Sequence, residues 1–96
     1  MKATIVVRLR HVFDDGALVE IKIWNVPEPV PPSRHRFKYS LFYGRPGRRI
    51  VGYDNERGKG DHRHYGEREE SYMFTTIRAL RDDFLADVAK ERGGLE

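Results

Sequence analysis

Apolar and polar residues alternate along two runs, residues 3–13 and 18–24. Ile, Val and Leu favour one parity of each run, and charged residues favour the other. A period of two with β-branched residues is typical of a half-buried strand. Between the runs, Asp15-Gly16 is a dipeptide preferred in tight turns, so the pattern predicts a β-hairpin over residues 3–24. The residues expected on the buried face of the first strand are Ala3, Ile5, Val7, Leu9 and Phe13.

Two further strands are predicted at residues 35–43 and 48–53, where the alternation returns. The segment 44–47 between them ends in Pro-Gly, which fits a type II turn with glycine at the position that needs a positive φ. Within the second of these strands, Gly52 marks a bulge or a close approach of another group.

A proline-rich segment, residues 26–33, separates the hairpin from these strands. Its four prolines cannot donate hydrogen bonds to a strand ladder, so we expect a stiff, extended connector. The alternative is a polyproline ligand for a partner protein.

The last part of the chain predicts an amphipathic helix from about residue 76 to residue 92, with Thr75 as its N-cap. Gly93 supplies the glycine expected after a helix. One apolar helix stripe needs one apolar sheet face. The predicted fold is therefore α+β, an antiparallel four-stranded β-meander packed on one C-terminal α-helix. The apolar stripe comprises Ile77, Leu80, Phe84, Leu85 and Val88, and the outer face Arg78, Asp82, Asp83, Asp87 and Lys90.

With 96 residues, the chain fits a single domain, assigned to residues 1–94, with residues 95–96 as a possible cloning remnant. No apolar run approaches the roughly 18 residues of a membrane span, and the first residues lack the apolar core of a signal peptide. The absence of cysteine excludes disulfides and thiolate chemistry. We therefore expect a cytoplasmic protein that does not enter a membrane.

Basic residues are concentrated on the sheet face that the predicted helix leaves free. Residues 34–49 contain six Lys or Arg residues and no acid. Cations around an aromatic residue suit single-stranded RNA, although a charged solvated face or a homodimer interface that includes Trp24 and Val6 are alternatives. The candidate nucleic-acid face consists of Arg8, Arg10, Lys22, Trp24, Arg34, Arg36 and Lys38.

The polar stretch 53–64 adds little to a core and is predicted to be a loop with another purpose. In it, Gly58 and Gly60 flank Lys59 and allow the backbone a positive φ or a close approach to a ligand. The full Gly-x4-Gly-Lys-Ser/Thr string of a P-loop is absent. The alternative is that these polar residues only shape a turn.

Strand-like spacing of His62 and His64 would put both imidazoles on one side of the chain. They are candidates for an acid/base pair or for two ligands of a divalent metal such as Zn²⁺ or Mn²⁺, with Asp54 and Asp61 completing the site. The cofactor is otherwise undetermined. The candidate phosphate-binding residues are Lys59, Arg63, Gly58, Gly60 and Asn55.

The same stretch resembles the signature of the TumE-type toxins of bacterial toxin–antitoxin systems. Similar segments lie upstream and downstream, and the resemblance spans residues 2–88. It implies a cytoplasmic growth-inhibiting toxin that is neutralised by an antitoxin encoded beside it, with no settled mechanism. The matching strings are Tyr53-Asp54-Asn55-Glu56-x-Gly58-Lys59-Gly60-Asp61-His62-x-His64, Trp24-x-Val26-Pro27-Glu28-Pro29-Val30, Phe37-Lys38-Tyr39 and Arg68-Glu69-Glu70-x-Tyr72-x-Phe74.

Three hypotheses for function follow. The first is a toxin of a type II module that cleaves RNA through residues 53–64. The second is a non-enzymatic module that binds nucleic acid or protein and inhibits by occupancy. The third is a small interaction domain in which residues 53–64 contact an antitoxin or a second copy of the chain.

Overall fold

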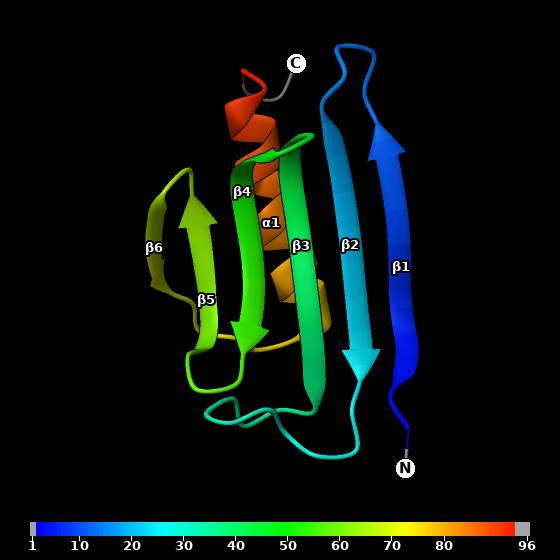
Figure 1. The fold of residues 1–96 in the computed structure, drawn as a ribbon, viewed down its shortest axis with the longest axis vertical. Helices are drawn as coiled ribbons and strands as arrows, with labels where there is room; N and C mark the ends of the chain where they lie inside the picture. The colour runs from blue at the N-terminus through cyan, green and yellow to red at the C-terminus, as the bar shows by residue number, and fades with distance from the viewer. Residues whose placement is uncertain (1, 94–96) are drawn as a thin grey trace.

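The computed structural model describes residues 2–93, which form one antiparallel sheet and one helix. Residues 95–96, the possible cloning remnant, lie outside the described residues. The strands lie in chain order across the sheet, so the topology is a meander (Figure 1). The elements are β1 (Thr4–Val12), β2 (Leu18–Asn25), β3 (Phe37–Arg45), β4 (Arg48–Glu56), β5 (Gly60–Tyr65), β6 (Arg68–Ser71) and α1 (Ile77–Glu91).

The α+β class, the antiparallel sheet and the C-terminal helix are confirmed, but the sheet has six strands rather than four. The predicted loop 53–64 is instead the end of β4, a tight turn and β5. The sequence of β5 and β6 shows no apolar alternation that would predict a strand, because both strands carry polar side chains on both faces. Hydrophobic periodicity therefore could not detect them.

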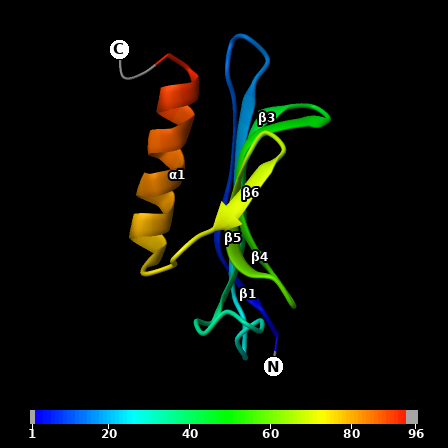
Figure 2. The ribbon, with the colours of Figure 1, turned by 90° about the vertical axis from the view of Figure 1, so that its left-hand side faces the viewer.

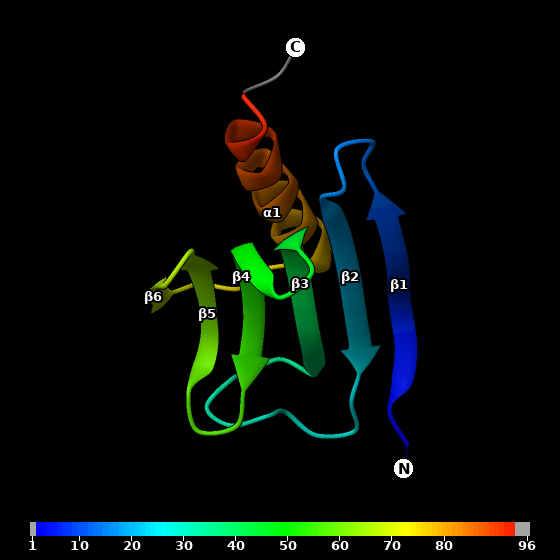
Figure 3. The same cartoon turned by 45° about the horizontal axis from the view of Figure 1, so that its top comes forward.

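Helix α1 covers one face of the sheet and leaves the other face uncovered (Figures 2 and 3). Leu80, Phe84 and Val88 are spaced by four residues, so they form a single buried stripe toward the sheet. Thr76, rather than the expected Thr75, caps the helix, because its side chain accepts a hydrogen bond from Ala79 N at 3.0 Å. The sheet side of the core consists of Ala17, Val19, Ile21, Ile23, Tyr39, Leu41, Tyr43, Val51 and Tyr53.

Two expected polar positions of α1 accept hydrogen bonds from tyrosine hydroxyls. Asp87 accepts hydrogen bonds from the hydroxyls of Tyr53 and Tyr65, and Asp83 accepts one from Tyr72 at 2.6 Å. The Asp87 contacts tie the helix to β4 and β5 in addition to apolar packing, and the Asp83 contact ties it to the segment between β6 and α1.

Strand β1 is an edge strand that is more exposed than its alternation predicts. A bulge between Ile5 and Val7 shifts the register, so that Ile5 lies opposite Trp24 on the uncovered face while Val7 stays opposite Ile23. The prediction that Ile5 and Val7 share a face was therefore wrong. Exposed apolar side chains remain on this strand, including Leu9 at 47%.

The proline-rich connector crosses the end of the sheet and reaches the β4–β5 turn (Figure 1). Gly58 N donates to Pro31 O at 2.8 Å, and Asn55 Nδ2 donates to Ser33 Oγ at 3.3 Å. These hydrogen bonds attach the connector to the hairpin. Among residues 2–93, no helix has both the length and the apolar character needed to cross a membrane.

Candidate functional site

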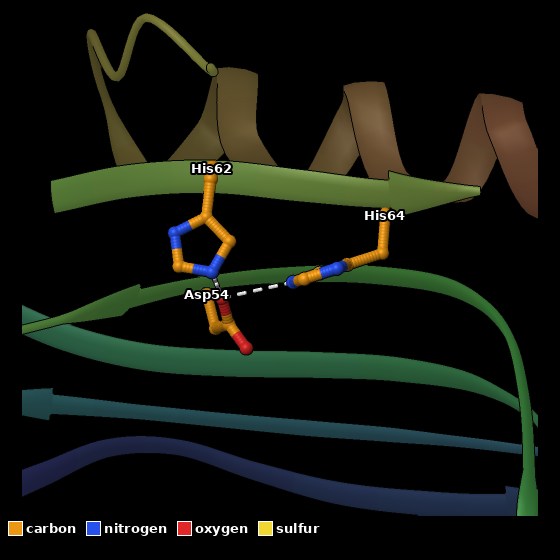
Figure 4. A group of neighbouring side chains, drawn as sticks. All are labelled: Asp54, His62 and His64. Carbon is orange, nitrogen blue, oxygen red and sulfur yellow. Dashed lines mark ion pairs between the residues drawn. The ribbon is translucent and has the colours of Figure 1, made fainter. Parts of the chain in front are cut away.

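The β4–β5 hairpin brings three of the candidate residues together on the uncovered face. Asp54 on β4 lies directly opposite His62 on β5, and Gly52 lies opposite His64. Directly opposed residues of antiparallel strands share a face. Since Val51 and Tyr53 point into the core, this face is the one that α1 does not cover. Figure 4 shows the two imidazoles directed at the carboxylate.

The three side chains meet at short distances. Asp54 Oδ1 lies 2.6 Å from His62 Nε2 and 3.5 Å from His64 Nε2 (Figure 4). Both histidines are buried, with 4% and 7% of their surface exposed. All three atoms are shielded from solvent, and none has a hydrogen-bond partner within the described part of the chain. Since buried polar atoms are nearly always paired, this cluster is unusual.

The tautomer of His62 is fixed by the backbone. Its Nδ1 lies 2.9 Å from Gly60 O, and a carbonyl can only accept, so Nδ1 carries the proton. In the neutral ring, Nε2 then presents a lone pair to Asp54 Oδ1. Two acceptors so close repel each other unless a proton or another cation lies between them. His62 Nε2 is therefore a candidate atom for holding a proton or a metal ion.

His64 is held by a residue that the sequence analysis did not select. Arg49 Nη2 lies 3.0 Å from His64 Nδ1. A Cβ at Gly52 would lie 2.6 Å from Arg49 Cδ, so the missing side chain is what lets the arginine reach across the strand. This is the close approach expected at Gly52. Burial is the main cause, and the charge of Arg49 the second, of a lowered pKa at His64.

Acidic and basic side chains surround the cluster. Glu69 Oε2 lies 3.1 Å from His62 Nε2 and 3.3 Å from Lys59 Nζ. Glu56 Oε1 lies 3.7 Å from the same imidazole atom. A surface hollow of about 400 Å³, lined in part by Lys59, His62 and Glu69, leads to the cluster. A ligand therefore has access to His62 from the β5–β6 side.

Asp61 does not join the histidine cluster, because it points to the opposite face of β5. It accepts hydrogen bonds from Ser33 Oγ and from Tyr39 Oη, the latter at 2.7 Å, and lies 2.6 Å from His35 Nε2. Burial raises the pKa of this carboxyl, but the three hydrogen bonds together outweigh burial and lower the pKa. Its contacts fasten the connector to the sheet.

Arg63 also lies on the helix side. It pairs with Glu70 at 2.7 Å and lies over the rings of Tyr53, Tyr65 and Tyr72. The structure therefore separates this cation from His62 and His64.

The other phosphate-binding candidates lie in and beside the β4–β5 turn. Lys59 is exposed at its tip, while Asn55 is fully buried and bonds the backbone of β3. Gly58 and Gly60 have φ of 89° and 79°, values that favour glycine. Of this set, Lys59 is the residue whose charged group lies near the cluster.

A row of polar side chains crosses the uncovered face and ends at the cluster. The strand register aligns Arg8, Lys22, Ser40, Asp54 and His62 from β1 to β5. Four steps of about 4.8 Å place the first and last of these residues about 19 Å apart.

The other members of the candidate nucleic-acid face divide into two groups. Arg10, Trp24 and Lys38 share the uncovered face by register, whereas Arg34 and Arg36 lie in the connector before β3 begins. The observed start of β3 at residue 37, two residues later than expected, explains this difference.

Sequence analysis missed Arg49 and Glu69 as neighbours of the cluster. The basic run 34–49 was recognised, but nothing in it singled out Arg49. Glu69 reads as part of a solvated charged run until β6 is known to pair with β5 at His64.

The fold and this cluster together define a small α+β protein with a candidate catalytic or metal-binding centre on an uncovered sheet face. A family model described as Toxin TumE matches residues 2–92. The chain therefore belongs to the TumE toxin family, as the resemblance implied. No curated protein and no solved structure matches the chain.

Proposed function

We propose that this protein is a growth-inhibiting toxin that cleaves RNA at the Asp54–His62–His64 cluster. The observation that carries the proposal is the convergence of three buried polar atoms that lack hydrogen-bond partners in the described chain, next to a surface hollow that His62 lines. Membership of the TumE toxin family supports the toxic activity. Unpaired buried groups are retained where chemistry needs them.

RNA is the substrate that the surroundings favour. Arg8 and Lys22 continue the row that contains Asp54 and His62, and Arg49 and Lys59 flank the cluster. These cations can hold a phosphodiester backbone, and His62 Nε2 would act on the proton of the attacking oxygen.

The test compares wild type with Asp54→Asn and with the His62→Ala/His64→Ala double variant, each expressed from a tightly repressed promoter. Growth and total RNA are followed, and circular dichroism confirms the fold. Loss of a group that acts on the reacting proton lowers the cleavage rate by about 100-fold or more, so we expect no growth arrest from either variant. His11→Ala is the matched control, because this histidine lies on exposed β1.

The same experiment can contradict the proposal. Equal growth arrest by wild type and the double variant, with RNA intact, would show that inhibition needs no catalysis. It would favour the second hypothesis, occupancy of a target by the basic face.

The proposal includes a cytoplasmic location and an antitoxin encoded nearby as partner. Strand β1 supports the expectation of a protein partner, because it is an open edge of the sheet with exposed apolar residues such as Leu9 and Val12. Arg8 and Arg10 on this strand disfavour pairing with a second copy of the same basic strand, so an acidic partner segment fits better than a homodimer.

A further inference from the structure

The cluster on the uncovered face has the composition and spacing of a metal site. One ligand atom from each of Asp54, His62 and His64 lies within 4.8 Å of the other two. We propose that these three residues bind one divalent transition-metal ion of the zinc class, with Glu69 as the fourth ligand.

The interatomic distances are close to those around a tetrahedral ion, one within the expected range and two shorter. Ligand atoms about 2.0–2.2 Å from zinc lie about 3.3–3.6 Å apart. Asp54 Oδ1 and His64 Nε2 are separated by 3.5 Å, and His62 Nε2 and Glu69 Oε2 by 3.1 Å. The closest pair, Asp54 Oδ1 and His62 Nε2 at 2.6 Å, needs to open by less than 1 Å, which is a small side-chain rotation.

His62 is already oriented as a ligand. Its Nδ1–H donates to Gly60 O, the arrangement by which metal-bound histidines fix the ring and direct Nε2 at the ion. A cation between Nε2 and Asp54 Oδ1 also replaces the repulsion of two acceptors by two favourable contacts.

His64 has a different tautomer from His62, because Arg49 contacts its ring. The arginine side chain can only donate hydrogen bonds, so His64 Nδ1 accepts one from Arg49 and carries the lone pair. The proton of the neutral ring is then on Nε2. Metal binding through Nε2 requires that proton to move to Nδ1, and Arg49 must then leave. Because Arg49 is exposed, it can do so. The ion and Arg49 therefore compete for His64.

Two imidazoles with two carboxylates favour zinc and its neighbours over magnesium, which prefers oxygen ligands and bound water. A zinc-class ion would serve the proposed RNA cleavage as a Lewis acid on the phosphodiester, so this use of the site rests on the proposed function. Metal binding itself can be measured without any activity.

The test is calorimetric titration of chelator-treated protein with Zn²⁺, supported by the visible absorption of Co²⁺. We expect one ion per chain for wild type and for His11→Ala. Affinity should fall by at least about 100-fold in Asp54→Asn and in His62→Ala, because even outer-shell partners are worth about 10–100-fold. If His62→Ala fails to fold, Asp54→Asn, which preserves shape, still decides the question. The proposal is overturned if wild type and Asp54→Asn bind equally, or if His11→Ala loses as much affinity.

Arg49→Gln provides an independent test that distinguishes binding at this cluster from adventitious binding of an ion elsewhere on the surface. Removing the competing cation should raise the affinity for Zn²⁺ several-fold, whereas Arg48→Gln, the neighbouring exposed arginine, should leave it unchanged. Unchanged or weaker binding in Arg49→Gln would contradict the proposed competition.

The outcomes also separate this inference from the proposed function. RNA cleavage that persists in chelator, by protein that binds no Zn²⁺, would overturn the metal site and leave the nuclease standing. One tightly bound ion in a protein that leaves RNA intact would support the site and overturn the nuclease.

Discussion

The side chain of Asn55 uses both ends of its amide inside the protein. Oδ1 accepts from Tyr39 N at 3.0 Å, and Nδ2 donates to Phe37 O at 2.7 Å and to Ser33 Oγ at 3.3 Å. The residue therefore closes the gap between β3, β4 and the connector. It was a candidate phosphate ligand by its place in the signature, yet its fully buried position points to a structural role.

We expect Asn55→Ala to lower the free energy of unfolding by about 2–4 kcal/mol. The change removes three hydrogen bonds, leaves the buried Tyr39 N–H without this partner, and does the same to the half-buried Phe37 C=O. Urea denaturation measures the effect. Asn25→Ala is the control, because Asn25 is exposed at the end of β2 and should change stability by less than about 0.5 kcal/mol. Equal effects of the two substitutions would contradict this assignment.

At the same scale, sequence could predict which residues carry chemistry but not how they are paired. The spacing of His62 and His64 correctly suggested a common side, because both lie on a strand. Asp54 and Asp61 looked equivalent, yet only Asp54 meets the histidines, since Asp61 differs in parity from them on β5. Without β5 in the prediction, that parity could not be applied.

The β4–β5 hairpin is the element on which the candidate site depends. It supplies Asp54, both histidines and the Gly60 carbonyl that orients His62. Sequence predicted β4 but ended it at residue 53, because residues beyond that point are polar on both faces. The signal that remained was the Gly-Lys-Gly turn, which marks the hairpin only once β5 is recognised as a strand.

Two glycines in this turn should respond differently to substitution. Gly58→Ala places a side chain at a φ of +89° in open space, which costs about 1–2 kcal/mol. Gly60→Ala adds a contact of 3.0 Å with Pro32 Cγ to the same backbone strain, so we expect a larger loss of stability. Thermal or urea unfolding compares them.

Gly47→Ala serves as the reference for these variants, because its φ is +76° and no atom lies within 4 Å of the added Cβ. It should match Gly58→Ala. A Gly60→Ala variant as stable as these two would show that the connector does not press on the β4–β5 turn.

At the scale of the whole molecule, the two faces of the sheet differ in purpose. The uncovered face carries the cluster and its cations, whereas the covered face joins apolar packing to tyrosine hydroxyls that bind carboxylates. Tyr53 and Tyr65 share Asp87, Tyr72 binds Asp83 and Tyr39 binds Asp61. The alternation of apolar residues predicted the covered face well over β2, β3 and β4, but hydroxyl–carboxylate pairs have no sequence periodicity and were not foreseen.

These pairs predict that stability falls at alkaline pH. Burial, and next the hydrogen bonds to carboxylates, raise the pKa values of Tyr39, Tyr53 and Tyr72 well above 10.0. A tyrosine whose pKa is raised in the folded state contributes its full stabilisation of the fold below its pKa in the unfolded chain, which is about 10. This stabilisation is lost as the pH rises above that value. Above this pH, a tyrosine can stay protonated in the folded protein after it has ionised in the unfolded chain. Each such tyrosine lowers the free energy of unfolding by at most about 1.4 kcal/mol per pH unit.

The measurement is urea denaturation at several values between about pH 8 and pH 11, with phenolate absorbance recorded on the folded protein. Native protein should show fewer ionised tyrosines than its total of five at the alkaline end. Tyr53→Phe should be less stable at about pH 8, because Asp87 loses a donor, and its stability should fall less steeply above about pH 10. If wild-type stability is level across this range, or if all tyrosines ionise in the folded protein near pH 10, then the hydroxyl–carboxylate pairs do not hold the helix to the sheet.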